Sequence, residues 1–186
     1  MDESFSSVTG TGTSASHGSR ASSSSRRRAL APKAGTQISV RPAEPSDAPR
    51  WIALRTALWP TSDPNEHAAE AAAFFAGTLR EPEAVLLAIG PDDAIAGFAE
   101  VSRRPYADGC HTSPVGYLEG WYVDPTVRHQ GVGRALLEAV EQWARRLGCR
   151  ELGSDTELEN EGSAAAHRAL GFEEVAVLRC FRKALD

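Results

Sequence analysis

The sequence predicts one α/β domain in which helices flank a mixed β-sheet. Three observations lead to this fold class. Short apolar, β-prone runs alternate with amphipathic segments in the order β-α-α-β-β-β-α-β-α-β. The length of 186 residues suits one domain with a full core. A strand, a basic glycine-containing loop and a strongly amphipathic helix also follow one another at residues 116–147.

Residues 1–35 are expected to be a disordered tail that precedes a folded domain over residues 36–186. Ten of the first 25 residues are serine and three arginines follow, so few apolar side chains are present to offset the entropy of ordering. Only a three-residue apolar run separates these arginines from Pro32, which is too short for a secretory signal. A chain that starts near Thr36 is therefore expected to fold.

The charge and the cysteines bound the possible partners and compartment. The tail holds five basic and two acidic residues, so the net charge of −5 for the whole chain leaves −8 on the domain. An acidic domain disfavours nucleic acid and suits a cationic substrate, although it also serves solubility. Three cysteines without metal or CxxC spacing favour a reducing cytoplasm, and no apolar run is long enough to cross a membrane. We therefore expect a cytoplasmic protein with no metal, no nucleic acid partner and no membrane partner.

The first half of the domain contains a strand, two helices and three further strands. The first strand lies around Ile38 and Val40, and polar residues 44–47 then cap a helix that Pro60 and Pro64 end. The other expected elements are an alanine-rich helix from about Asn65 to Arg80, strands at Ala84–Ile89, Ala94–Arg103 and Gly116–Val123, and a turn at residues 91–93.

The helix after residue 131 has the clearest periodic pattern. One face carries Val132, Leu136, Val140, Trp143 and Leu147, and Gly148 provides a suitable C-terminal stop. The remaining expected elements are a strand at Glu151–Ser154, a helix at Ser163–Leu170 and a last strand at Phe172–Phe181.

The loop before this helix is suited to a phosphate-bearing ligand. A strand stops at Asp124, and Arg128, Gly131 and Gly133 follow in a tight turn. Backbone N–H groups at a helix N-terminus attract anions, and glycines let an anion approach the backbone. The third glycine of a dinucleotide fingerprint and the Gly-Lys-Ser/Thr of a P-loop are both missing. A plain strand–turn–helix without a ligand is the alternative.

Two motifs resemble the GNAT family of N-acetyltransferases, and the order of elements is similar over about residues 37–185. Residues 128–133 resemble the family's Arg/Gln-x-x-Gly-x-Gly/Ala loop, and Asn160 followed by His167 and Gly171-Phe172 resembles its Asn…Tyr-x-x-x-Gly-Phe ending. The resemblance implies the GNAT fold, a mixed, mostly antiparallel sheet with splayed central strands that admit acetyl-CoA. It also implies that Asn160 contacts the pantetheine arm. His167 replaces the family's tyrosine and could act as general acid or simply pack.

The resemblance implies acetyl-CoA as co-substrate and places its contacts around the loop. The implied cofactor-binding residues are Trp121, Tyr122, Val123, Arg128, Gln130, Gly131, Val132, Gly133, Arg134 and Asn160. Backbone N–H groups near Tyr122 and Val123 would polarise the thioester carbonyl and stabilise its oxyanion.

Four further segments stand out in the substrate half of the sequence: Leu58-Trp59, residues 104–109, the run Thr-Ser-Pro-Val-Gly-Tyr-Leu-Glu-Gly at residues 112–120, and Ser154-Asp155. Together they resemble bacterial aminoglycoside 6′-N-acetyltransferases. This narrower resemblance implies that Trp59, Tyr106, Glu119 and Asp155 line a pocket for a polycationic drug, and carboxylates and aromatic faces suit such a ligand. Asp155 or Glu119 would deprotonate the 6′-amine. A further substrate carboxylate of that family aligns with Ala176, which leaves the range of accepted drugs open.

Other functions are compatible with the sequence. The chain could be an acetyltransferase for another small amine or for a protein N-terminus. A non-catalytic protein that binds drug or acyl-CoA, and a structural role in which the Ser/Arg tail binds a partner, are the remaining alternatives. Because relatives of this kind are often dimers, a homodimer is expected by analogy alone.

Overall fold

A computed structural model describes residues 38–185, so the tail expected over residues 1–35 lies outside the described residues. The strands are β1 (Ser39–Pro42), β2 (Ala84–Ile89), β3 (Ile95–Arg104), β4 (Val115–Val123) and β5 (Leu152–Ser154). The helices are α1 (Ala48–Leu58), α2 (Pro64–Phe75), α3 (Val132–Arg146) and α4 (Glu161–Ala169), with short 3₁₀ turns η1 (Pro45–Asp47) and η2 (Pro125–Val127). Among these helices, none is both long and apolar enough to span a membrane.

The five strands form one mixed and mostly antiparallel sheet, as expected. Their order is β1-β2-β3-β4-β5, and each neighbouring pair is antiparallel except β4 and β5, which are parallel. Two parallel neighbours need a crossover connection, and α3 supplies it between β4 and β5. The loop predicted to bind phosphate, at the start of α3, therefore follows the end of β4.

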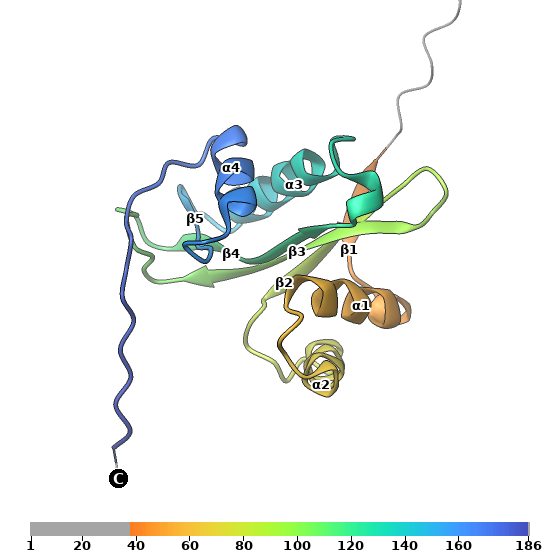
Figure 1. Ribbon diagram of the computed structural model, residues 1–186, viewed down its shortest axis with the longest axis horizontal. Helices are drawn as coiled ribbons and strands as arrows, with labels where there is room; N and C mark the ends of the chain where they lie inside the picture. The colour runs from red at the N-terminus through yellow and green to blue at the C-terminus, as the bar shows by residue number, and fades with distance from the viewer. Residues whose placement is uncertain (1–37, 186) are drawn as a thin grey trace, which may run out of the picture. The chain divides into compact units, whose positions relative to one another are not determined.

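Helices cover both faces of the sheet (Figure 1). On one face, Trp51 and Leu54 of α1 pack with Phe98 and its neighbours on the strands, and α2 joins this cluster. On the other face, Leu136 and Val140 of α3 pack against a second set of strand residues. The predicted apolar face of α3 is therefore the buried one, and α4 lies on the same side as α3 (Figure 1).

The boundaries of α2 differ from the prediction. Pro64 was expected to break a helix but is the first residue of α2, because proline suits the first turn and the Asp63 side chain caps it. The helix ends at Phe75 rather than near Arg80. Gly77 adopts a φ of +69°, a left-handed conformation that commonly ends helices.

The last strand predicted at Phe172–Phe181 is not formed. From Glu173 the chain runs as an extended arm (residues 173–185) that pairs with no strand among the described residues (Figure 1). Its large apolar side chains Val175, Val177, Leu178, Phe181 and Leu185 are each at least 60% exposed. The arm has the composition of a strand, but a strand also needs a hydrogen-bonding neighbour, and composition alone does not supply one.

Two irregularities of β4 shape the functional site. A β-bulge leaves Glu119 without an opposite residue, because Glu100 of β3 pairs with Gly120 and the next residue of β3 pairs with Leu118. Towards β5, the ladder ends at Leu118 opposite Ser154, and the rest of β4 has no described strand partner on that side. The two strands therefore part at Glu119, as the expected splayed arrangement requires.

Candidate active site

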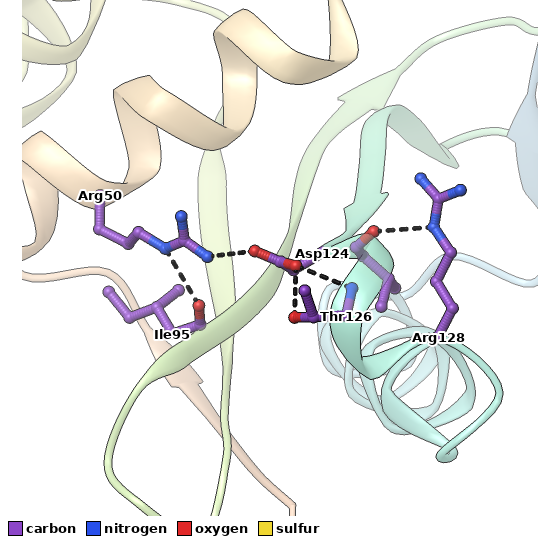
Figure 2. A network of polar contacts seen from close by, with 6 residues as sticks. Arg50, Ile95, Asp124, Thr126 and Arg128 are labelled. Atoms are coloured by element: carbon purple, nitrogen blue, oxygen red, sulfur yellow. Dashed lines mark hydrogen bonds and ion pairs between the residues drawn. The ribbon is translucent and has the colours of Figure 1, made fainter.

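The start of the loop after β4 is fixed by a network around Asp124 (Figure 2). The carboxylate accepts hydrogen bonds from the backbone N–H and the hydroxyl of Thr126 at 3.0 and 2.7 Å, and it pairs with Arg50 of α1 at 2.5 Å. Arg50 also donates to the carbonyl of Ile95 at 3.3 Å. Hydrogen bonds from Thr126 and then Arg50 lower the pKa of Asp124 to about 2, so this anchor is charged at neutral pH.

The predicted phosphate loop is exposed and leads directly into α3. Arg128 donates from Nε to the carbonyl of Val123 at 3.1 Å (Figure 2), and its guanidinium lies 5.5 Å from the centre of the Tyr122 ring. His129 and Gly131 have φ values of 62° and 90°, which turn the chain sharply before the helix. Among the described residues, no side chain caps the N-terminus of α3. Its first backbone N–H groups are therefore available to an anion.

The two loop glycines do different things. A Cβ at Gly131 would meet nothing within 4 Å, so the surface there is open to a ligand, and the φ of +90° favours glycine. A Cβ at Gly133 would lie 2.8 Å from the indole of Trp121. Gly133 thus lets Trp121 approach α3 closely, which the sequence analysis did not foresee. Three other residues of this loop and the first turn of α3 were expected to bind the cofactor. Gln130 and Arg134 are exposed, whereas Val132 is buried in the core.

His167 lies between α4 and the end of β5. Its Nδ1 is 2.8 Å from the carbonyl oxygen of Ser163 and its Nε2 is 3.0 Å from the hydroxyl of Ser154. The ring also makes edge contacts with Trp121 and Phe172, at centroid distances of 5.5 and 5.0 Å. Because a carbonyl only accepts hydrogen bonds, Nδ1 carries the proton of the neutral ring. His167 can donate a proton from Nε2 only when the imidazole is protonated there as well.

Asn160 has a structural task at the start of α4. Its side-chain oxygen accepts a hydrogen bond from the backbone N–H of Ser163 at 3.0 Å, as an N-cap residue does. The amide NH₂ group takes no part in this cap. Contact between Asn160 and the pantetheine arm remains a prediction that this geometry permits.

Glu119 and Asp155 are connected through two other side chains. Arg104, the last residue of β3, binds the Glu119 carboxylate through both prongs, with Nε–Oε1 at 3.1 Å and Nη2–Oε2 at 2.5 Å. The guanidinium carbon of Arg104 lies 3.5 Å from the centre of the Tyr117 ring. The Tyr117 hydroxyl donates to Asp155 at 2.5 Å. Burial, and then this hydrogen bond, raise the pKa of Tyr117 well above its ordinary value, so the hydroxyl keeps its proton.

The two carboxylates are therefore occupied to different degrees. The Glu119 side chain is 17% exposed, and Arg104 binds both of its oxygens. Asp155 is exposed beyond the end of β5, and among the described residues only its Oδ1 accepts a side-chain hydrogen bond. Asp155 is the carboxylate better able to take a proton from a ligand. A second cation at Glu119 must share the carboxylate with Arg104 or displace Arg104 from it.

Arg104 and Tyr117 were given no role in the sequence analysis. Both lie within the runs at residues 104–109 and 112–120 that carry the narrower resemblance, which is the only signal that could have pointed to them. Their contacts depend on the bulge at Glu119, and a bulge has no reliable mark in one sequence.

The structure separates the two aromatic residues expected in the pocket. Trp59 packs against β4 beside the bulge, so closely that a Cβ at Gly120 would lie 2.6 Å from its indole. Tyr106 is 65% exposed, and its hydroxyl donates to Asp108 of the same loop at 2.8 Å. Trp59 is therefore brought next to Glu119, whereas Tyr106 contacts none of the other predicted site residues by a described polar or aromatic interaction.

A buried ion pair supports Trp59. Arg55 lies 5.2 Å from the centre of the Trp59 ring, and its Nε is 2.9 Å from Oε1 of Glu100 while its Nη1 is 2.6 Å from Glu70. Trp51 donates to the same Glu100 oxygen at 2.8 Å. Glu100 is 2% exposed, and burial raises its pKa to about 7 against the attraction of Arg55. The network ties α1 and α2 to β3 behind the acidic site.

An uncapped helix N-terminus beside two parting strands defines a fold that can hold an extended anionic ligand between its central strands. Residues 50–172, which include β4, the loop and α3, match the model of the acetyltransferase (GNAT) family. The chain belongs to this family. Among the described residues, no group of three or more His, Cys, Asp or Glu side chains is placed to hold a metal ion.

Relatives and solved structures narrow the comparison. The aminoglycoside N(6′)-acetyltransferase type 1 of Klebsiella aerogenes is 52% identical over 146 residues, which are 78% of this chain and 96% of the relative. The protein of the same name from Stenotrophomonas maltophilia is 48% identical over 149 residues, or 79% of this chain and 94% of the relative. The aminoglycoside N-acetyltransferase AAC(6′)-Iy in complex with CoA has a TM-score of 0.74 at 36% identity and covers 84% of this chain and 100% of its own. AAC(6′)-Iy has also been solved with a bisubstrate analog, CoA-S-monomethyl-acetylneamine, with a TM-score of 0.73 at 36% identity, over 80% of this chain and 99% of that one.

Proposed function

We propose that this protein is an aminoglycoside 6′-N-acetyltransferase. It transfers the acetyl group of acetyl-CoA to the 6′-amine of aminoglycoside antibiotics and so confers resistance. The observation that carries the proposal is the acidic cluster at the point where β4 parts from β5, where Arg104 links Glu119 to the ring of Tyr117 and the Tyr117 hydroxyl donates to Asp155. Carboxylates and aromatic faces suit a ligand with several ammonium groups. The names of the relatives support the same substrate.

Acetyl-CoA is the co-substrate, and the CoA complexes of AAC(6′)-Iy support its place between the strands. The backbone from Arg128 to Gly133 and the N-terminus of α3 hold the pyrophosphate. Backbone N–H groups near Tyr122 and Val123 polarise the thioester carbonyl and stabilise the oxyanion that forms when the amine attacks. Trp121 and Asn160 line the path of the pantetheine arm. The exposed side chains of Gln130 and Arg134 contact the cofactor at the loop.

The two carboxylates have separate roles. Asp155 takes the proton from the substrate ammonium, directly or through a water, because its Oδ2 accepts no described hydrogen bond. Glu119, whose side chain is 17% exposed and less accessible than that of Asp155, anchors an ammonium. Trp59 and Tyr106 contribute aromatic surface, Tyr106 after movement of its exposed loop. Protonated His167 returns a proton to the CoA thiolate as the C–S bond breaks.

Asp155→Asn and Glu119→Gln test the proposal, because both keep size and remove charge. Asp155→Asn is expected to lower kcat for kanamycin or tobramycin by about 10²–10⁴-fold, the range for loss of a general base. Glu119→Gln is expected mainly to raise KM for the drug. Both variants should bind acetyl-CoA as the wild-type protein does, since the phosphate loop is separate. Wild-type rates and drug affinity in both variants would point to another amine as substrate.

We further infer a homodimer in the cytoplasm, with no nucleic acid and no membrane as partner. The arm over residues 173–185 exposes five large apolar side chains, and a second copy is the partner that would cover them. Beside β5, a groove of about 410 Å³ lined in part by Gly153, Phe172 and Val175 offers room for such a contact. The cysteines Cys110, Cys149 and Cys180 are all unpaired, which supports a reducing compartment.

A further inference from the structure

The carboxylate assigned to bind substrate already binds a cation of the protein itself. Arg104 meets Glu119 with two parallel N–H···O contacts, the strongest geometry for a guanidinium and a carboxylate. The carbon of the same guanidinium lies over the Tyr117 ring, 3.5 Å from its centre. Arg104 therefore uses both features that an ammonium group seeks in this pocket, a carboxylate and an aromatic face.

The Arg104 contact differs from the buried pair nearby. Arg55 is 8% exposed and bridges two carboxylates, Glu70 and Glu100, so it is enclosed on all sides. The Arg104 side chain is 34% exposed and, within the described part of the chain, forms an ion pair only with Glu119. Glu119 is the more deeply placed partner, so Arg104 covers it from the solvent side. Arg104 also ends β3, where the chain leaves the sheet for the irregular segment at residues 105–114.

We propose that Arg104 is a displaceable internal counter-ion whose guanidinium occupies the place of a substrate ammonium on Glu119 and Tyr117. Binding exchanges one cation for another: the drug's ammonium takes the Glu119 carboxylate and Arg104 turns to solvent. The inference rests on the proposed function, because it needs Glu119 to bind the drug. It assigns Arg104 a part in specificity rather than in the chemical step.

The exchange lowers the affinity of the site for its ligand and increases its selectivity among amines. In this exchange, a ligand binds Glu119 only after the Arg104–Glu119 contact breaks. The observed affinity is therefore the affinity for free Glu119 multiplied by the fraction of molecules in which that contact is broken. An amine with few further contacts cannot compensate for this loss, whereas a polycation can. Because Arg104 is about one-third exposed and the pair is screened by water, the effect should be about three- to tenfold in Kd.

The test is Arg104→Gln, with Arg103→Gln as the matched control. Arg103 is the neighbouring residue, binds Glu83 through both prongs and is 45% exposed, so its substitution removes the same charge beside a different carboxylate. By calorimetry, Arg104→Gln should lower the Kd of kanamycin about three- to tenfold, and its KM should fall with little change in kcat. Arg103→Gln should stay within about twofold of wild type. Arg104→Lys keeps the charge without the fork and should lie between wild type and Arg104→Gln.

Opposite results would overturn the inference in distinguishable ways. A higher Kd in folded Arg104→Gln protein would make Arg104 a drug-binding or structural residue. If Glu119→Gln weakens the binding of kanamycin but Arg104→Gln does not tighten it, only the exchange is wrong. If Glu119→Gln leaves the Kd unchanged, the anchor of the proposed function is wrong as well. In the wild-type protein, the Nε–H NMR signal of Arg104 should shift on saturation with kanamycin while that of Arg103 does not, and an unmoved Arg104 signal contradicts the exchange without any variant.

Discussion

Gly131 is the residue at which the phosphate loop can be tested most directly. A valine there would strain a φ of +90° and would extend into open space where the pyrophosphate is expected. We expect Gly131→Val to cost about 1–2 kcal/mol of stability and to raise the KM for acetyl-CoA. Calorimetry with acetyl-CoA and thermal melts measure the two effects separately.

Gly148→Val provides the control for that experiment. Gly148 follows the other end of α3, has a φ of +82° and likewise has nothing within 4 Å of an added Cβ. It should therefore lose similar stability but bind acetyl-CoA normally. A folded Gly131→Val protein with unchanged acetyl-CoA affinity would show that the loop does not hold the phosphates. Gly133 is less suitable, because substitution there would displace Trp121.

Glu100 gives the protein a pH-dependent stability. Burial raises its pKa from the ordinary 4.5 to about 7, so the folded state holds a proton that the unfolded state has released between these values. Stability should therefore fall as pH rises from about 4.5 to about 7, by on the order of 3 kcal/mol for this group. Glu100→Gln keeps an acceptor for Trp51 and removes the titration. Urea unfolding at pH 5 and pH 8 should show a smaller pH dependence in the variant, and an equal dependence would mean that Arg55 keeps Glu100 ionised throughout.

At the same scale, the resemblance to a known family predicted Glu119 and Asp155 as site residues, but it did not predict their partners. Glu119 lies within the strand predicted at Gly116–Val123, Asp155 directly follows the strand predicted at Glu151–Ser154, and both belong to runs that resemble a known family. The partners follow from the bulge: Leu118 and Trp121 both pack towards α3 although only two residues lie between them, which regular alternation forbids. Without knowledge of this one-residue shift in register, the sequence could not predict which β3 residue faces a given β4 side chain.

At the scale of elements, strong periodicity predicted more than caps and breakers did. The strand at Ala84–Ile89 has the predicted bounds, and α3 begins at Val132 and ends within two residues of the predicted stop. Both are long apolar or amphipathic patterns that packing reinforces. The end of α2 was misplaced because Ala-rich sequence favours helix beyond Phe75, while Gly77 turns the backbone to the left-handed region instead.

The η2 turn links the sheet to the cofactor loop, and Asp124 is its cap. Asp124→Ala would remove the hydrogen bonds to Thr126 and the ion pair with Arg50, which together fix the exit of β4 (Figure 2). We expect a loss of about 1 kcal/mol in stability and a higher KM for acetyl-CoA, with kcat less affected. Steady-state kinetics and thermal melts provide the measurement.

Asp63→Ala is the matched control for Asp124→Ala. Asp63 caps α2 with a hydrogen bond from Asn65 at 2.9 Å, on the face of the sheet away from α3. The Asp63→Ala variant should lose similar stability without a change in the KM for acetyl-CoA. If both variants raise that KM equally, the effect comes from general destabilisation and Asp124 does not position the loop.

At the scale of the whole molecule, the mixed and mostly antiparallel sheet that the resemblance predicted is confirmed, but the last strand predicted from the sequence is not formed. The pattern from Phe172 to Phe181 is apolar and β-prone, yet a strand forms only where another strand accepts its hydrogen bonds. Within the described residues, β5 is three residues long and ends the sheet. Sequence indicates what a segment can form, but the neighbour that completes it can come from another chain.

The arm therefore carries the prediction on assembly. Phe181 is 92% exposed and Val177 is 67% exposed, and burial of such side chains contributes about 1.5–3 kcal/mol each. We expect the wild-type protein to sediment as a dimer at micromolar concentration and the double variant Val177→Asp, Phe181→Asp to sediment as a folded monomer. Ala184→Asp places the same acid on the arm without removing a large apolar side chain, and it should remain dimeric. A wild-type monomer at every concentration, or a double variant that stays dimeric, would show that the arm does not hold two copies together.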